Sequence, residues 1–376
     1  MMKQAIPLHN KEACIALLGV RDEPTDGVED YCRYLAGALE PRGFALELVR
    51  VPWRELGWRA ALRKLDEQSR AWRGRRVFLQ YTALAWSRRG FPLGVLRVLK
   101  RLKKNGVRCA IVFHDSGPYP GERLRDRIRR QVQIQVMRRA ARQTELAILN
   151  VPAENMSWLP ATGHRAVFIP VGANLPAPEQ AWTQEKRESG GAPAVAVFCV
   201  SEGKPERAEV AHLVETARYA AERAGAFRLV VLGRNAEHAG PMIQEGLRGT
   251  SVEVVIHGLL SGEEVVRQLG MCSVLLFLRG GISTRRGSAV AGISCGLPVI
   301  ASACEETGGP ILEAGVVLLP PGAWTEFGPA LARVLSDAAY RSDLAARSRR
   351  AQELFFSWQA IAARYVEVLE KSRASR

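Results

Sequence analysis

The sequence predicts an α/β protein with two doubly wound domains that face each other across a cleft. Three observations lead to this prediction. The chain has 376 residues, which is more than a single hydrophobic core usually supports. Short apolar runs alternate with helical patterns along the chain, as in parallel sheets that helices cover on both faces. A polar stretch rich in Pro and Gly, residues 176–193, interrupts the alternation, and its residues 179–193 are predicted to be a linker.

The apolar runs define the strands of each domain. For the first domain, residues 1–178, they predict strands at 13–20, 44–51, 75–82, 107–115, 146–150 and 166–173, and helices at 28–43, 92–105 and about 121–142. For the second domain, residues 194–355, they predict strands at 194–200, 227–233, 252–258, 273–278, 297–302 and 315–320, with helices between them.

Basic residues are concentrated in the first half of the chain. Residues 1–180 hold 31 Lys and Arg against 17 Asp and Glu, whereas the remaining residues hold 22 against 21. This asymmetry predicts an anionic partner for the first half: nucleic acid, a phospholipid surface or a phosphorylated substrate.

The helix predicted at 121–142 combines apolar and basic positions. A stripe of apolar residues is expected to face the core, and it consists of Leu124, Ile128, Val132 and Val136. Arginines occupy the other positions and predict docking on an anionic membrane surface. A solvated basic face without a partner explains the same pattern.

The seven cysteines are scattered and show no metal-ligand spacing. They are interpreted as reduced core thiols. There is no signal-like segment and no apolar run of about 18 residues that could span a membrane. A cytoplasmic protein is therefore expected, bound peripherally at the inner face of the membrane if the basic helix docks there.

Candidate ligand-binding residues follow the predicted strands, because open α/β sheets bind ligands beyond the carboxyl ends of their strands. These candidates are Gly27, Tyr81, His114 and Asp115 in the first domain, and Gly233, Arg234 and the segment 285–288 in the second. A histidine or aspartate at a strand end also has an ordinary structural explanation.

The stretch "RGGISTRRGSAVAGISCGLPVIAS", residues 279–302, predicts an anion site. Gly287 and Ser288 open a helix, whose backbone N–H groups, dipole and hydroxyl favour an anion. Arg285 and Arg286 add charge-assisted hydrogen bonds. A phosphate or diphosphate fits this junction, although a solvated N-cap would have the same sequence.

Several familiar motifs are missing from the sequence. It has no G-x-G-x-x-G after a first strand, no phosphate loop of the G-x-x-x-x-G-K-[ST] type and no Asp-x-Asp pair. A hydride-transfer enzyme and a common nucleotidase are therefore not expected, and neither is a bound metal or another cofactor.

The order of "RLVVLGRN", "VEVVIHGLLSGEEVVRQLGMCSVLLFL", "SCGLPVIAS" and "LLPPG" resembles the C-terminal domain of glycosyltransferase family 4. The stretches "FHD", "FIPVGAN" and "VFLQYTALAWSRRGFP" resemble its N-terminal domain, and "FSWQAIAARYVEVLEK" resembles its closing helix. The resemblance implies the GT-B fold of two Rossmann-like domains, with residues 356–376 packing back on the first domain.

The family implies a function, and the strand-end and anion-site candidates given above supply most of the site residues for it. It implies a retaining, metal-independent transfer of a sugar from a nucleoside-diphosphate sugar to a glycan or lipid-linked acceptor, in cell-envelope or exopolysaccharide biosynthesis. His114 and Arg286 would be catalytic. The donor would be bound by Lys204, Arg207, Gly233, His257, Gly258, Ser283, Arg285, Gly287 and Ser288, and the acceptor by Gly27, Tyr81 and Asp115.

The chain also departs from the family pattern. Ser283 and Ala291 occupy the positions of two glutamates, the second of which commonly binds the nucleotide ribose. The usual Gly-Arg and Lys-Gly pair is altered to "CVSEGKPERAE", which leaves Lys204 and Arg207 as candidates. Ribose recognition must therefore differ, with "STRRGS" lining the donor pocket, or activity has been lost.

Two other functions remain open from the sequence. One is a relative that transfers no sugar, such as a sugar-nucleotide epimerase or an inactive partner subunit. The other is a module that binds nucleic acid or another polyanion, which explains the charge. The sequence shows no nucleic-acid recognition motif, so nucleic acid is not the expected partner.

Overall fold

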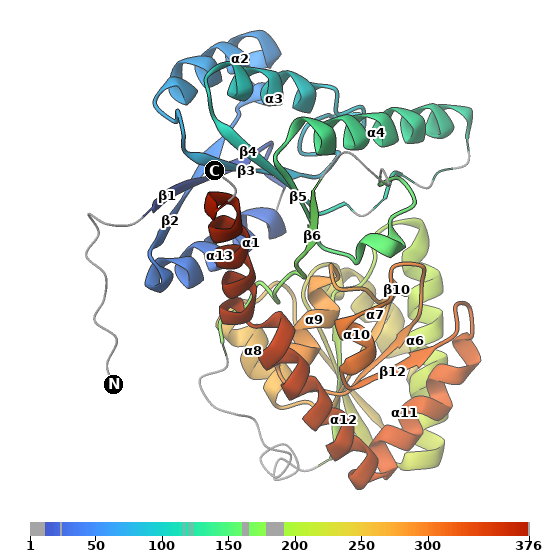
Figure 1. The fold of residues 1–376 in the computed structure, drawn as a ribbon. Coiled ribbons are helices and arrows are strands. Elements are labelled where there is room, and N and C mark those ends of the chain that lie inside the picture. The colour runs from blue at the N-terminus through green and yellow to red at the C-terminus, as the bar shows by residue number, and fades with distance from the viewer. Residues whose placement is uncertain are drawn as a thin grey trace, which may run out of the picture. The chain divides into compact units, whose positions relative to one another are not determined.

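The computed structural model describes residues 12–22, 25–115, 117–119, 121, 123–159, 165–177 and 192–374 (Figure 1). The chain forms two compact units. The first consists of residues 1–170 and 358–376, and the second of residues 171–357. The linker predicted at 179–193 lies outside the described residues except for positions 192 and 193.

The first unit contains a parallel six-stranded sheet in the order β2-β1-β3-β4-β5-β6. Its strands are β1 (Glu12–Leu18), β2 (Phe44–Arg50), β3 (Arg76–Tyr81), β4 (Arg108–Phe113), β5 (Leu146–Leu149) and β6 (Ala166–Phe168). Its helices are α1 (Gly27–Leu39), α2 (Trp53–Arg70), α3 (Gly94–Lys104), α4 (Leu124–Gln143) and α13 (Trp358–Ala374). Helices α2, α3 and α4 cover one face of the sheet, and α1 and α13 cover the other (Figure 1).

Helix α13 packs on α1, although the two are far apart in sequence. The hydroxyls of Tyr31 and Tyr365 lie 2.8 Å apart as a buried hydrogen-bonded pair. Trp358 stacks on Tyr34, and Ile361 is fully buried. Burial of these aromatic side chains completes the face of the sheet that α1 alone would leave partly open.

Helix α2 was not predicted from the sequence. Its composition is strongly polar, and Gly57 has φ 72° and ψ 157°, which interrupts the helical geometry near its start. Only a narrow set of side chains is buried, namely Trp53, Ala61, Leu62, Leu65 and Ser69. A short apolar stripe broken by a glycine gives a weak helical period in the sequence.

The predicted orientation of α4 is wrong for its first half. Val136 is 1% exposed, but Leu124 is 73% and Ile128 is 53% exposed. The buried face of the helix is instead formed by Asp126, Gln133, Val136, Met137, Ala140 and Ala141. Leu124 and Ile128 lie one turn apart on the opposite side of the helix.

The second unit contains another parallel six-stranded sheet, in the order β12-β11-β10-β7-β8-β9. Its strands are β7 (Ala194–Phe198), β8 (Phe227–Leu232), β9 (Val252–Ile256), β10 (Val274–Gly281), β11 (Val299–Ser302) and β12 (Val316–Leu319). Its helices are α6 (Lys204–Ala224), α7 (Ala236–Gly246), α8 (Gly262–Gly270), α9 (Gly287–Ser294), α10 (Pro310–Glu313), α11 (Phe327–Ser336) and α12 (Ala338–Ala351).

Helices cover both faces of this second sheet. Helices α6, α7 and α11 pack with one cluster of buried side chains, and α8 and α9 pack with the other. Helix α9 lies close to the sheet because Gly292 has no side chain; a Cβ there would lie 2.8 Å from Leu275 Cδ2. The α/β fold class with two doubly wound parallel sheets is confirmed.

No helix in the described part of the chain combines the length and the apolar composition that crossing a bilayer requires.

Candidate functional site

The junction between β10 and α9 is an irregular turn at the carboxyl edge of the second sheet. The register of β10 against β11 shifts between Phe277 and Gly281. Ser283 and Thr284 are fully buried, and α9 then begins at Gly287. The irregular strand end directs the following loop, including Arg285 and Arg286, toward this edge of the sheet.

Arg285 is held by a carboxylate at this junction. Its Nε and Nη2 donate to the two carboxylate oxygens of Glu306 at 2.7 and 2.9 Å. The hydroxyl of Ser283 donates to the same carboxylate at 3.1 Å. The charge of Arg285 is therefore balanced within the protein, and the predicted donor residues Ser283 and Arg285 share Glu306 as a partner.

Arg286 has a different environment from its neighbour. Its Nε is buried and has no hydrogen-bond partner among the described residues. Burial lowers the pKa of Arg286, and the positive charge of Arg285 lowers it further. A guanidinium that is partly desolvated and lacks a full counterion favours an anionic ligand.

Arg279 is a second half-buried arginine at this junction, and it was not among the residues selected from the sequence. It lies near the end of β10, and its Nε is also buried without a hydrogen-bond partner among the described residues. Its positive charge also acts to lower the pKa of Arg286, so the two guanidinium groups lie in the same region. The sequence did contain a signal for it, because Arg279 directly follows the apolar run "SVLLFL" and so stands at a strand end.

The start of α9 adds donors of another kind. The first amides of a helix have no acceptor within the helix, and here they belong to Gly287 and Ser288. Arg286 occupies the N-cap position and makes no side-chain capping bond. A Cβ added to Gly287 would meet no atom within 4 Å, so the space beside the helix start is open.

The loops after β7, β8 and β9 are tied together at the same edge. Gly233 has φ 88°, and its N–H donates to the carbonyl of Gly258 at 3.0 Å. The side-chain amide of Asn235 donates to the carbonyl of Ser201 at 2.6 Å. These bonds fix the loops that contain the predicted donor residues Gly233 and Gly258.

Two predicted donor residues lie on α6. Arg207 is exposed in the first turns of this helix. Lys204 is the first residue of α6, but its side chain lies outside the described residues. A buried carboxylate is close by: Glu209 accepts a hydrogen bond from the N–H of Ser201 at 3.1 Å, and burial raises its pKa.

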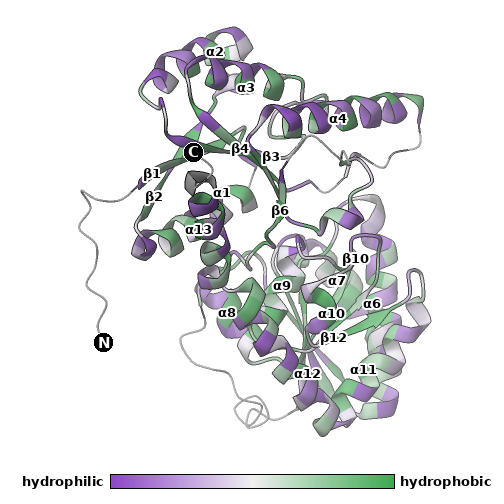
Figure 2. Cartoon of the chain, in the orientation of Figure 1, coloured by the Kyte–Doolittle hydropathy of each residue, from purple (hydrophilic) through white to green (hydrophobic). Residues whose placement is uncertain are grey.

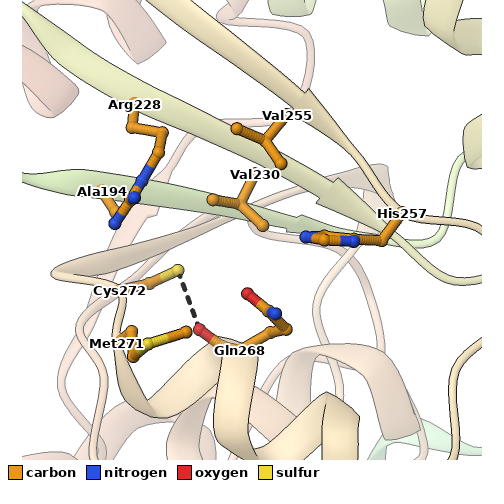
Figure 3. A pocket seen from close by; sticks show the side chains of 8 residues that line it. All are labelled: Ala194, Arg228, Val230, Val255, His257, Gln268, Met271 and Cys272. Carbon is orange, nitrogen blue, oxygen red and sulfur yellow. Dashed lines mark hydrogen bonds between the residues drawn. The ribbon is translucent and has the colours of Figure 1, made fainter.

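His257 faces a cavity of about 220 Å³ between the sheet and α8 (Figure 3). The figure shows its ring at one end and Arg228 at the other. The cavity is lined by Ala194, Arg228, Val230, Val255, His257, Gln268, Met271 and Cys272. It is smaller than ordinary ligand pockets of roughly 300 Å³ or more, so a contact between His257 and a nucleotide base stays a prediction.

His114 follows β4 at the carboxyl edge of the first sheet. Its Nε2 lies 2.8 Å from Oε1 of Gln80, and its ring packs edge-on against Tyr31. Burial lowers the pKa of His114 to about 4. The imidazole is therefore neutral near pH 7. Because Oε1 of Gln80 only accepts, Nε2 holds the proton, and Nδ1 can accept a hydrogen bond from a ligand.

The three predicted acceptor residues have unequal surroundings. Tyr81 is fully buried against Phe113 in the core, and its hydroxyl has no hydrogen-bond partner among the described residues. Asp115 accepts a hydrogen bond from the N–H of Ala83 at 2.6 Å, which joins the loops after β3 and β4. Tyr81 is therefore not accessible to an acceptor, and the oxygen of Asp115 that bonds Ala83 is already occupied.

Gly27 is exposed at the start of α1. The carboxylate of Asp26 accepts from the N–H groups of Val28 and Glu29 at 3.0 and 3.1 Å. Glu29 and Asp30 add acidic groups in the first turn. Arg50 pairs with both Asp26 and Glu29, so these charges are balanced within the protein. Because Asp26 already caps the amides, this helix start suits a neutral hydroxyl-bearing ligand better than an anion.

Within the described residues, no group of three His, Cys, Asp or Glu side chains is placed to hold a metal ion.

Comparison with known proteins identifies the fold. No protein-family model and no curated protein matches the chain. The structure is similar to sucrose-phosphate synthase from Thermosynechococcus elongatus, with a TM-score of 0.67, 18% identity, and coverage of 97% of this chain and 100% of that one. It is also similar to Anabaena HepE in complex with UDP and glucose, with a TM-score of 0.64, 14% identity, and coverage of 96% and 100%.

A third similar structure is assigned as a UDP-N-acetylglucosamine 2-epimerase from Listeria monocytogenes, with a TM-score of 0.60, 12% identity, and coverage of 97% of each chain. At these identities the similarity shows the fold and not the reaction. The chain therefore has the GT-B fold, with two Rossmann-like domains.

Proposed function

We propose that the chain is a glycosyltransferase that moves a sugar from a nucleoside-diphosphate sugar to a hydroxyl of a glycan or lipid-linked acceptor. One observation carries the proposal: Arg279 and Arg286 have buried Nε groups without hydrogen-bond partners among the described residues, beside the open start of α9. The fold supports it, because similar structures include one with UDP and glucose.

The charge at this junction fits a diphosphate. Arg285 is balanced by Glu306, whereas the Nε groups of Arg279 and Arg286 have no hydrogen-bond partner among the described residues. The carboxylate of Glu209 also acts on Arg279, so Arg286 is the cation with the least compensation. The amides and the dipole of α9 add a third favourable element. Two phosphoryl groups would satisfy both guanidinium groups, whereas one phosphate would leave one of them with little compensation.

The same groups supply the chemistry of transfer. Breaking the bond between the sugar and the diphosphate builds negative charge on the leaving oxygen. Arg279, Arg286 and the α9 amides would stabilise that charge without a metal ion. We further propose that neutral His114 hydrogen-bonds the reacting sugar and that the reaction retains the anomeric configuration.

The acceptor side of the proposal rests on the first unit. Its basic helices favour an acceptor carried by an anionic membrane, as in cell-envelope or exopolysaccharide biosynthesis at the cytoplasmic face. Gly27, at a helix start with a carboxylate cap, is the accessible candidate for binding an acceptor hydroxyl.

The test is a ligand screen of the full chain. Thermal-shift and calorimetric titrations with UDP, GDP, ADP and their sugars should give saturable binding for one nucleotide family, unaffected by a metal chelator. Slow hydrolysis of the matching nucleotide sugar should accompany it. Absence of nucleotide binding, together with tight salt-sensitive binding of oligonucleotides, would refute the proposal.

An epimerase is the second candidate, because a protein assigned to that reaction has a similar structure. It predicts the same nucleotide binding but a different product. Proton NMR of the nucleotide sugar after incubation separates the two: a change of configuration with the nucleotide still attached indicates the epimerase.

A further inference from the structure

Helix α4 presents an exposed face without a negative charge. Its exposed residues are Leu124, Arg125, Arg127, Ile128, Arg130, Gln131, Gln135, Arg139, Arg142 and Gln143. The single acidic residue of this helix, Asp126, is buried and pairs with Arg129 at 3.2 Å. Five arginines therefore face solvent from a helix that offers them no carboxylate.

Helix α3 extends this cationic surface, because it packs beside α4. Its exposed residues are Arg97, Lys100, Arg101, Lys103 and Lys104, and the helix contains no acidic residue. Figure 2 shows hydrophilic colouring along α4 in this part of the unit. The two neighbouring helices thus form one positively charged flank.

Large apolar side chains gather where these two helices begin. Leu124 and Ile128 are exposed on the first turns of α4, and Leu93 is 51% exposed directly before α3. Helices that follow parallel strands begin at the same edge of the sheet. Leu84, which is 69% exposed, and Tyr119, which is 47% exposed, follow β3 and β4 at that edge.

Side-chain contacts hold these loops against α4. Gln133 donates to the carbonyl of Gly90 at 2.8 Å and accepts from the N–H of Tyr119 at 2.7 Å. The guanidinium of Arg129 lies 4.7 Å from the ring centre of Tyr119 and 5.9 Å from that of Phe91. The apolar side chains and the basic flank consequently belong to one ordered surface, which we call the α3–α4 surface.

We propose that the α3–α4 surface docks on an anionic phospholipid bilayer, with Leu124 and Ile128 entering the acyl boundary and the flanking arginines binding headgroups. An interfacial helix combines these two features, because apolar insertion and attraction to anionic lipid act together. The docking deepens the proposed function, because it names the lipid surface that would present the acceptor. Only this link to the acceptor rests on the proposed function.

The apolar component decides between a bilayer and other partners. Binding to nucleic acid would use the arginines but would leave two exposed aliphatic side chains without a role. A second copy of the chain would bring two cationic surfaces together, which like charges disfavour. Of these three partners, a bilayer is the one that uses the aliphatic and the cationic groups at once.

Co-sedimentation of the full chain with vesicles tests the docking. One set of vesicles is phosphatidylcholine alone, and the other contains ~30% phosphatidylglycerol, so that the charge of the surface is varied. The first variant is Leu124→Gln with Ile128→Gln, and the second is Arg125→Gln with Arg127→Gln and Arg130→Gln. The matched control, Leu312→Gln with Leu354→Gln, changes two leucines of the second unit that are 57% and 49% exposed.

The parent chain should bind the anionic vesicles only. The aliphatic variant should bind them about tenfold more weakly or worse, because two side chains lose their burial in the acyl boundary. The affinity of the arginine variant for anionic vesicles should fall roughly fivefold for each charge removed. The control should bind as the parent does, and all variants should keep the melting temperature of the parent.

Two results would overturn the docking proposal. One is an aliphatic variant that binds anionic vesicles as tightly as the parent. The other is displacement of the parent from vesicles by a short DNA duplex that the aliphatic variant binds equally well, which would assign the surface to nucleic acid. Binding of UDP, GDP and ADP without vesicles is measured on the same samples, so a failure of docking stays distinct from a failure of the proposed donor site.

Discussion

Arginine is used differently in the two units. In the first unit, five arginines of α4 are exposed, and the one carboxylate of that helix, Asp126, is buried and pairs with Arg129 instead. In the second unit, Arg279, Arg285 and Arg286 are half-buried at one junction, and Glu306 balances Arg285. A diffuse exposed charge attracts any anionic surface and is screened by salt, whereas a fixed half-buried charge selects a ligand by geometry.

The largest effect is expected when the half-buried arginines Arg279 and Arg286 are removed, which tests directly whether they bind the ligand. A charge-assisted hydrogen bond contributes about 1.5 to 3 kcal/mol, so Arg279→Ala and Arg286→Ala should each weaken nucleoside-diphosphate binding roughly ten- to a hundredfold. The double variant should be at least about tenfold weaker than either single variant. Isothermal titration calorimetry measures these affinities.

The matched control for these variants is Arg350→Ala, which removes an exposed arginine of α12 in the same unit. It should bind the nucleotide as the parent does, and binding of the bare nucleoside should change little in any variant. Full nucleotide affinity in the folded double variant would mean that the diphosphate binds elsewhere.

The next prediction concerns the balanced arginine. Glu306→Ala leaves Arg285 and Ser283 without their shared acceptor, and the pair is only about one-quarter exposed. The free energy of unfolding should fall by about 1 to 2 kcal/mol. Chemical denaturation gives this value, and Glu305→Ala, the adjacent position, should cost far less.

His114 provides a pH-dependent prediction within the first unit. Its folded pKa of about 4 lies below the ordinary value of 6.5, so the folded state prefers the neutral ring. This contribution to stability is present above pH 6.5 and is lost as the pH falls toward 4. When the pH falls from about 7.5 to about 5.5, protonation of His114 in the unfolded state should lower the free energy of unfolding by about 1 kcal/mol.

Urea denaturation at both pH values measures this change, and His114→Gln keeps a hydrogen-bonding side chain without a titrating ring. The parent should lose more stability on acidification than the variant. Equal losses in the two proteins would show that His114 is protonated as easily in the folded state as in the unfolded one.

The smallest expected effect is the response of the donor site to salt. Raising sodium chloride from about 0.05 to about 0.3 M should weaken nucleotide binding only about two- to threefold, because half-buried charges are poorly screened. The same change should reduce binding to anionic vesicles by more than tenfold. Similar salt slopes for both ligands would remove the distinction between the two groups of arginines.

Periodicity alone predicted most of the fold. The apolar runs of both sheets are long and regular, and most strands appear where the pattern placed them. The exception is the strand predicted at 166–173, which ends at Phe168. Helix α2 was not predicted because Gly57 interrupts its apolar pattern. The buried face of α4 was predicted wrongly for its first half because arginines surround the apolar positions there. In such a helix, burial depends on where the neighbouring loops attach, which a local pattern does not contain.

The site was less predictable for the same reason. The partner of Arg285 is Glu306, which follows a different strand 21 positions later. Nothing local to "STRRGS" distinguishes the balanced arginine from Arg286, or reveals that Arg279 is half-buried nearby. Tyr81 was selected because it ends a strand, but both faces of that strand are covered by helices, so its side chain lies in the core.

The hydrogen bond between Tyr31 and Tyr365 has a consequence for synthesis, because these residues are 334 positions apart. At about 5 to 20 residues per second, the ribosome makes the partner of Tyr31 roughly 15 to 70 seconds after Tyr31 itself. During that interval the whole second unit emerges while one face of the first remains uncovered. The first unit begins to be translated first, but its last helix, α13, is made after the whole second unit. A nascent chain that stops before α13 exposes the aromatic face of α1 to chaperones and proteases.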